Sequence, residues 1–234
     1  MKKNEGSDTK AIEEEGIEAA EAGIETRDDP APAGFGLGTN SKALFQPKRG
    51  TVFVAPKDTE LPTDLSKLLI SCEGTGAWSN LGHTSADNLP SWDSDGGDAT
   101  SKDSWKTPGA RTTYDAKTVS VSVKSIQADA KTLKFIYNGW EQADPAKPKG
   151  VVMSLDPAPR DIAMVVVSYD PGTDSNFGMY MPSASMKADG MPDLSSDFVE
   201  FGFKANAQSS NVLPAGPNGQ EGAFMLLTPE YFTV

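Results

Sequence analysis

An alternating strand is the feature that most constrains the fold of this chain. Valine occupies every second position from Val119 to Val123, and serines stand between the valines. Because successive side chains of a strand point to opposite faces, one face of this strand is apolar and the other is polar. This arrangement is typical of an antiparallel sheet that covers a core with one face and meets water with the other.

A short helical pattern follows this strand. It starts at Asp129, a residue type that caps helix N-termini, and Gly139 stands just past its end. The apolar residues Leu133, Ile136 and Tyr137 recur at helical spacing and would form one face. We expect this helix to pack across an open side of the sheet.

Further strands are indicated elsewhere in the chain, with turn residues between them. They are expected at 51–54, 151–153, 162–169, 177–181, 198–203 and 223–227. Segment 162–167 is apolar on both faces, so it is buried either in the core or at a subunit contact. The sequence therefore predicts a mainly β fold, a β-sandwich or partly open barrel with one packing α-helix.

The stretch from about His83 to Arg111 is dominated by Asp, Ser, Thr, Gly and Pro. This composition predicts a structureless loop that buries little in its own subunit. A loop of that length is unusual in a compact domain and usually has a function. Two large aromatic residues on it, Trp92 and Trp105, suit anchors at a protein interface.

An acidic turn within this loop, with Asp93, Asp95 and Asp98, resembles the start of a calcium-binding loop. The EF-hand pattern requires a glutamate at its twelfth position, where this chain has Ser104. A solvated acidic turn is therefore the simpler interpretation, and a structural ion is the alternative. One cysteine and one histidine exclude a Cys/His zinc cluster. We expect no cofactor.

Catalytic patterns are missing from the sequence. His83 is the only histidine, and no Gly-x-Ser-x-Gly nucleophile elbow accompanies it. Carboxylate residues are plentiful, but they fall in turns, and no spacing singles out a catalytic pair. The sequence therefore predicts a protein that is not an enzyme.

Residues 1–40 differ in composition from the rest of the chain. Up to Gly34 there are ten acidic and four basic residues, and the whole chain has a net charge of −12. Such a segment cannot bury enough apolar surface to order itself. We expect an acidic N-terminal arm with a marginal helix at about 10–25, either flexible or docked on a neighbouring subunit. The β domain is then expected to span 41–234.

Two other kinds of signal are missing as well. The sequence has no Lys/Arg-rich run, which argues against a surface that grips nucleic acid. It also has no apolar run long enough to span a membrane, and no apolar segment of the kind found in a secretory signal follows Met1. We expect a protein that is synthesised in a cytoplasm and has no membrane span.

Several motifs occur together in one part of the chain. They are the pattern Trp-x-Asn-Leu-Gly-His-Thr-Ser at 78–85, the Asp-Gly-Gly turn at 95–97, Trp105, and the valine strand with its helix. In this order they resemble the major tail tube protein family of long, non-contractile-tailed bacteriophages, the siphophages. The resemblance covers about residues 41–234.

The resemblance implies a structural virion protein of the phage tail. Its subunits would form hexameric rings stacked into a hollow tube, and viral DNA would pass through the lumen into the host without specific binding. An acidic lumen suits that role because it repels phosphate. Tape-measure, tail terminator and distal tail proteins are further implied partners.

The family's long loop reaches toward the adjacent ring, which implies an inter-ring interface on this chain. The expected interface residues are His83, Trp92, Asp93, Asp95, Asp98, Trp105 and Arg111. Two alternatives stay open: another virion β-protein, such as a tail terminator or a capsid decoration protein, and a β-sandwich carbohydrate-binding module. A binding module would be monomeric, whereas a tube protein would polymerise.

Overall fold

The computed structural model describes residues 38–40, 43–156, 158–192, 194 and 197–232. The chain divides into two units, residues 1–41 and 42–234. Apart from residues 38–40, the arm expected at 1–40 lies outside the described residues, as does its helix at 10–25. The fold described below is that of the second unit.

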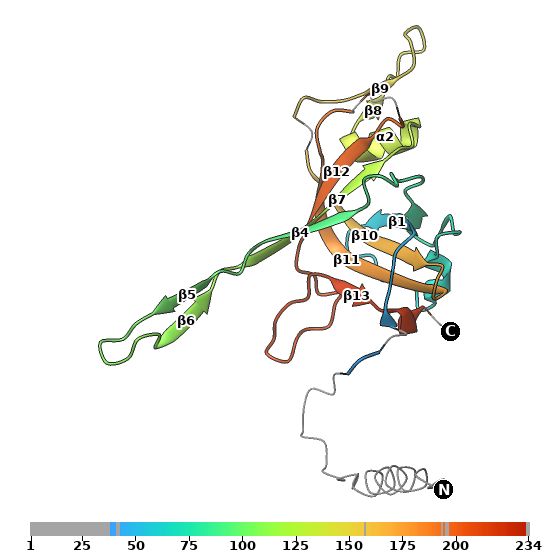
Figure 1. Cartoon of the computed structure of the whole chain (residues 1–234). Helices are drawn as coiled ribbons and strands as arrows, with labels where there is room; N and C mark the ends of the chain where they lie inside the picture. Colours follow the sequence, from blue (N-terminus) through green and yellow to red (C-terminus); the bar gives the residue numbers. More distant parts are fainter. Residues whose placement is uncertain (1–37, 41–42, 157, 193, 195–196, 233–234) are drawn as a thin grey trace, which may run out of the picture. The chain divides into compact units, whose positions relative to one another are not determined.

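Within the described residues, nine strands form one antiparallel sheet (Figure 1). Its order is β2-β3-β1-β10-β11-β12-β7-β4, and β13 pairs with β11 beside this path. The strands are β1 (Arg49–Pro56), β2 (Gly74–Thr75), β3 (Trp78–Asn80), β4 (Ser91–Gly96), β7 (Lys117–Ser125), β10 (Arg160–Asp170), β11 (Ser175–Ala188), β12 (Phe201–Ala207) and β13 (Met225–Leu227). The mainly β fold expected from the sequence is confirmed.

Shorter elements surround this sheet. Two strand pairs stand apart from it, one short 3-10 helix lies between β1 and β2, and another follows β13. They are the pair β5 (Ala99–Lys102) and β6 (Arg111–Tyr114), the pair β8 (Trp140–Glu141) and β9 (Val151–Val152), and the 3-10 helices η2 (Leu65–Leu68) and η3 (Pro229–Tyr231).

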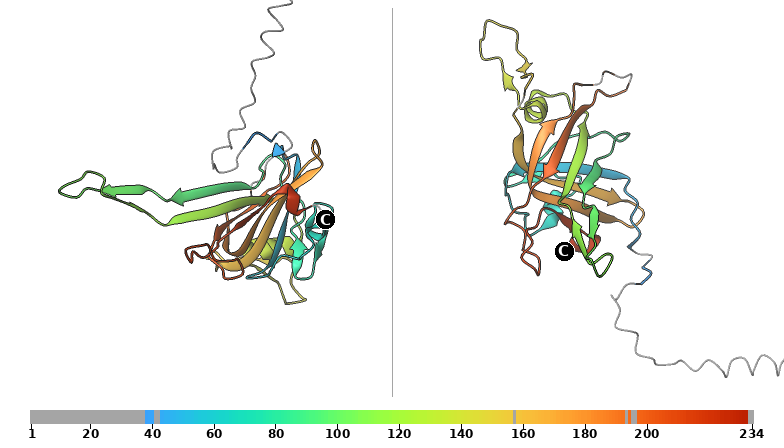
Figure 2. Two further views of the ribbon diagram at one scale, coloured as in Figure 1. Left: turned by 90° about the horizontal axis from the view of Figure 1, so that it is seen from below. Right: turned by 90° about the vertical axis from the view of Figure 1, so that its left-hand side faces the viewer.

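The long strand β11 makes the sheet turn over on itself. Its first half, at 178–180, pairs with β13, and its second half, at 184–188, pairs with β12. The register between β10 and β11 shifts between Ile162 and Met164, which marks a bulge where such strands bend. As a result β12 and β7 lie over β1 and β10 in a sandwich (Figure 2).

The central strands β1 and β10 are buried on both faces. On one face, Val52 packs with Phe203 and other residues of β7 and β12. On the other face, Phe53 packs with Trp78 and with the apolar residues of η2. Every residue of 162–167 is at most 7% exposed, so this segment is buried within the subunit and not at a subunit contact.

The α-helix of the described range, α2 (Ala130–Tyr137), covers the first of these two clusters. Ile136 and Tyr137 are buried, and Leu133 is half-buried against the same cluster. The ring of Phe135 meets the ring of Phe203 edge-on at 6.2 Å. The helix expected after the valine strand is therefore present and packs on the sheet.

The start of α2 depends on Asp129. Its carboxylate accepts hydrogen bonds from the backbone N–H groups of Lys131 and Thr132. Hydrogen bonds from the side chains of Gln127 and Thr132 and from this backbone lower the pKa of Asp129 from 3.8 to about 2. The cap is therefore stronger when the carboxyl group is ionised.

We expect Asp129→Ala to lower the free energy of unfolding by ~1 kcal/mol at neutral pH, because the helix loses its cap. A depressed pKa stabilises the fold above the unfolded value and loses its effect as pH falls through the folded value. The difference between wild type and Asp129→Ala should therefore shrink from about pH 4 toward pH 2. Urea unfolding at several pH values measures it. Asp129→Asn, which keeps the cap without titrating, is the matched control.

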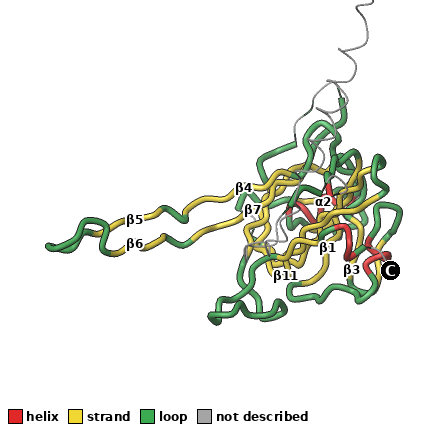
Figure 3. The backbone as a smooth tube through the Cα atoms, turned by 60° about the horizontal axis from the view of Figure 1, so that its bottom comes forward, coloured by secondary structure: helices red, strands yellow, loops and turns green. Residues whose placement is uncertain are grey.

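The prediction of a structureless loop at 83–111 is wrong for the central part of this stretch. Residues 91–102 pair with 111–122 in one hairpin, with β4 on β7 and β5 on β6 (Figures 1 and 3). The register runs from Ser91↔Ser122 to Lys102↔Arg111, and the backbone N–H of Asp115 donates to the carbonyl of Asp98 at 3.1 Å between the two parts. In the outer pair, β5 and β6, backbone hydrogen bonds hold polar residues in strands without a buried face.

Candidate assembly interface

The outer part of this hairpin, residues 97–116, extends away from the body and is called the projecting hairpin below (Figure 3). Every residue of β5 and β6 is exposed. At ~3.3 Å per residue, the extended segment from Gly97 to Lys102 has a length of about 20 Å. A two-stranded hairpin is at best marginally stable alone in water, so its length and exposure favour a partner that covers it.

Two glycines join the projecting hairpin to the body. Gly96 and Gly97 have φ angles of 82° and 80°, which disfavour other residue types. A Cβ atom at Gly96 would lie 2.3 Å from the carbonyl oxygen of Ala116 on the opposite strand. The backbone at this junction therefore requires glycine, and the junction sets the direction in which the hairpin leaves the body.

The tip of the projecting hairpin is an ordered turn. The backbone N–H groups of Ser104 and Thr107 donate to each other's carbonyl oxygens at 2.9 and 3.2 Å. The carboxylate of Asp103 accepts from the backbone N–H of Gly109 at 2.6 Å. The turn presents Trp105, which is fully exposed. A rigid turn that displays a bare indole ring is typical of an interface anchor.

The outer part of the projecting hairpin, residues 99–114, is basic in an acidic chain, whereas Asp98 and Asp115 at its base balance this charge over the whole of 97–116. Residues 99–114 contain Lys102, Lys106 and Arg111 against one carboxylate, Asp103, whereas the whole chain carries a net charge of −12. Two of these cations, Lys102 and Lys106, are not among the interface residues expected from the sequence. The change of sign along 93–111 is the signal that would have found them.

The profile of the phage tail tube protein family matches residues 37–215. The chain belongs to this family. The match spans strands β1 to β12, including the projecting hairpin, and it confirms the resemblance seen in the sequence. No curated protein matches the chain.

Membership in the tail tube family gives the chain a structural role in the virion tail. It implies self-assembly into a tube together with other tail proteins, and a role that is not enzymatic. Among the described residues, no helix is long and apolar enough to cross a membrane.

Two of the residues expected at the interface of this tail tube protein lie on its body. Trp92 on β4 is half-buried against the core cluster of β7, β12 and α2, opposite Val121. His83 is exposed, but its backbone joins the end of β7, since its carbonyl accepts from the N–H of Ile126 at 3.0 Å. Both residues therefore hold the segment before the hairpin onto the body.

The acidic residues lie at the base of the hairpin and the remaining two expected residues lie farther out. Asp93 and Asp95 are on β4 and Asp98 follows it, whereas Trp105 is at the tip and Arg111 is in β6. Asp93 forms a long ion pair of 3.8 Å with Lys204 of β12. Since β4 is a strand and not a loop, its aspartates cannot wrap around an ion as in a calcium loop. Among the described residues, no cluster of three or more ligand side chains could hold a metal.

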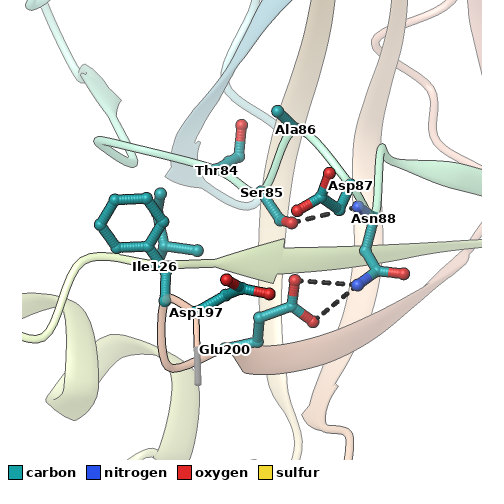
Figure 4. A pocket seen from close by; sticks show the side chains of 9 residues that line it. Thr84, Ser85, Ala86, Asp87, Asn88, Ile126, Asp197 and Glu200 are labelled. Carbon is teal, nitrogen blue, oxygen red and sulfur yellow. Dashed lines mark hydrogen bonds between the residues drawn. The ribbon is translucent and has the colours of Figure 1, made fainter. Parts of the chain in front are cut away.

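A cleft of about 350 Å³ beside this region is lined by polar side chains together with Ile126 and Phe198 (Figure 4). The side-chain amide of Asn88 donates to both carboxylate oxygens of Glu200 at 2.8 and 2.9 Å. Hydrogen bonds from Asn88 and from the Ser85 hydroxyl keep the pKa of Glu200 below its ordinary value. These contacts clamp segment 84–88 onto the body. His83 does not line the cleft, so Ser85 has no imidazole base there.

Proposed function

We propose that this tail tube protein is the major tail tube subunit of a phage with a long, non-contractile tail. In this role it forms hexameric rings, and the rings stack into a hollow tube that conducts viral DNA into the host. The projecting hairpin is the observation that carries the proposal, because it is long, exposed and ends in a bare tryptophan.

The sheet offers a further reason for assembly. Its outermost strands are β2 and β4, and each presents backbone groups that a neighbouring subunit can pair. A head-to-tail contact makes a ring when its rotation closes, and a filament when it does not. A subunit with open sheet edges and a projecting hairpin can use both kinds of contact, one within the ring and one between rings.

Electron microscopy of the concentrated full-length protein tests this function. We expect long hollow tubes with a regular ring repeat and six-fold cross-sections. Rings that never stack would instead fit a tail terminator. A protein that stays monomeric at every concentration would contradict the proposal and favour a binding module.

The proposed conduit requires that DNA slides without sticking. Because the chain has a net charge of −12, we expect no binding of duplex DNA at near-physiological salt. Gel-shift assays on both the free protein and the tubes measure this. A shift at micromolar protein that disappears as salt is raised would show a basic DNA-binding surface and contradict an acidic lumen.

The domain organisation is part of the proposal: residues 1–40 act as an arm that docks on a neighbouring subunit, and residues 41–234 form the tube domain. We expect a protease to cleave the arm in the free subunit and to spare it in the tube, because docking would bury its cleavage sites. Limited proteolysis with mass spectrometry measures both states. Equal cleavage in both would show that the arm is only a tail.

Tape-measure, tail terminator and distal tail proteins are the other partners that this function requires. The protein would be synthesised in the host cytoplasm and act in the virion.

A further inference from the structure

An apolar groove lies on the body, away from the projecting hairpin. It has a volume of about 310 Å³, and Leu61, Pro62 and Leu65 line one side of it. Leu226 of β13 and Tyr231 of η3 line the other side and are 47% and 61% exposed. The groove is therefore an open apolar surface of a size that can take one large side chain.

The groove and the hairpin tip lie at opposite ends of the body. In Figures 1 and 3 the hairpin leaves one side of the sheet, while η2 and η3, which border the groove, lie on the other side. Two such surfaces cannot meet within one subunit. They meet between copies arranged head to tail, which is the heterologous contact that builds stacks and filaments.

The charges around the two surfaces are complementary. Three carboxylate residues directly precede lining residues of the groove: Glu60, Asp64 and Glu230. Among the described residues that line the groove, none is Lys or Arg. Lys57 and Lys67 are the cations nearest to it in the sequence, and Lys57 forms an ion pair with Asp161. The hairpin tip carries Lys102, Lys106 and Arg111. Opposite charges at the rim of an apolar contact favour this pairing and fix its orientation.

A second apolar pocket of about 390 Å³ has the opposite charge and serves as the rival site. It lies between β1 and the segment before β4, and Leu89 and Trp92 line it together with Lys48 and Arg49. No carboxylate is among its lining residues in the described part of the chain. A basic hairpin tip is repelled there, so charge selects the first groove.

We propose that the hairpin tip of one subunit docks in the apolar groove of the next copy, with Trp105 as the inserted side chain. The proposal rests on the proposed tube function and names its contact between copies. The indole ring fills the groove between η2 and η3, and the cations of the tip face the carboxylates of the rim. Large aromatic side chains that enter a partner's pocket dominate the binding energy of such interfaces.

Cross-linking in assembled tubes tests this contact. Cys72 is the only cysteine, so Cys72→Ser provides a cysteine-free background. In that background, Lys106→Cys next to the indole is combined with Leu226→Cys in the groove. The matched control combines Lys106→Cys with Leu89→Cys, because Leu89 is similarly exposed at 57% but lines the rival pocket. Each single-cysteine variant is a further control.

We expect a short bis-maleimide to convert most tip-and-groove subunits into a ladder of covalent multimers, and the control pair into none. Trp105→Ala should raise the critical concentration for tube formation by on the order of tenfold or more. Trp140→Ala, which removes another exposed tryptophan (54% exposed) from β8, should leave it unchanged.

The outcomes separate this contact from the tube function itself. Tubes that form normally without a tip-and-groove ladder overturn the contact and leave the function standing, and a ladder only from the control pair assigns the tip to the rival pocket. The contact is also overturned if the Trp105→Ala and Trp140→Ala variants assemble equally well. If neither the wild-type nor the Cys72→Ser protein forms tubes, both the contact and the proposed function fail.

Discussion

Removing residues 99–114 should leave a folded, soluble subunit that no longer forms long tubes. The shortened chain joins Asp98 to Asp115 through Asn-Gly, the dipeptide preferred in two-residue hairpin turns. Asp98 and Asp115 are already hydrogen-bonded to each other, since the N–H of Asp115 donates to the carbonyl of Asp98 at 3.1 Å. The body should tolerate the change because every removed residue of β5 and β6 is exposed and loop-closure entropy depends weakly on length.

Circular dichroism and thermal unfolding report on the fold of this variant, and electron microscopy reports on tubes. We expect a stability within about 1 kcal/mol of wild type, as for changes at exposed sites, and rings or monomers in place of tubes. Tubes of normal length would contradict a role of the projecting hairpin in stacking. An unfolded product would show that the subunit needs the hairpin to fold.

A wider deletion should behave differently. Removing 86–108 would also remove β4, which pairs with β7 along its whole length, and with it Trp92, which packs on the core. The exposed edge of β7 and the lost aromatic contact should destabilise the body itself. Comparing the two deletions therefore distinguishes the residues needed for tube assembly from those needed for the fold of the subunit.

The elements that the sequence predicted well are those whose burial produces a clear apolar period. Strand β7 alternates valine and serine, and Val121 and Val123 are fully buried. Segment 162–167 is apolar throughout because both faces of β10 are covered. In each case packing dictates the residue types, so the pattern can be read without knowing the partners.

The projecting hairpin could not be predicted in this way. Its strands have no buried face, so their residues, Ala-Thr-Ser-Lys and Arg-Thr-Thr-Tyr, show no apolar period, and the pairing is held by the backbone. The composition of the stretch also gives no reason to expect different burial for Trp92 and Trp105. They differ because the register of β4 on β7 places Trp92 opposite the buried Val121, whereas the turn at 104–107 leaves Trp105 in solvent.

Strand β11 shows a second limit of sequence patterns. It was expected at 177–181 and extends to Ala188. Pro182 and Ser183 interrupt the apolar pattern, but Ser183 is fully buried and its hydroxyl donates to the side-chain oxygen of Gln208 at 2.8 Å. A satisfied buried hydroxyl costs little, so the strand continues where the sequence predicts its end.

The apolar groove could not be predicted from the sequence for a third reason. Its walls come from residues 61–65 and 225–231, which are far apart in the chain. The pattern of 223–227 predicts a strand, but neither segment alone indicates a groove. Only the fold, which brings η2 and η3 to the same side of the sheet, creates the surface.

The largest loss of stability from one substitution is expected at Phe203 of β12. Its side chain is fully buried, and its ring meets the ring of Phe135 on α2. It also pairs with Val123 across the strands. Phe203→Ala therefore leaves a cavity where the sheet and the helix meet, and a core Phe→Ala change costs ~3–5 kcal/mol. That is a large part of the ~5–15 kcal/mol that stabilises an ordinary domain.

Urea and thermal unfolding of the full-length protein below its assembly concentration measure this loss. We expect Phe203→Ala to lower Tm by on the order of 10 °C. Phe198→Ala is the matched control, because Phe198 is 72% exposed and its removal should change stability by no more than ~0.5 kcal/mol. Equal stability of the two variants would mean that α2 does not pack on β12 in solution. Phe203→Leu, which refills most of the cavity, should recover much of the loss, since volume-conserving changes in a core cost less than truncations.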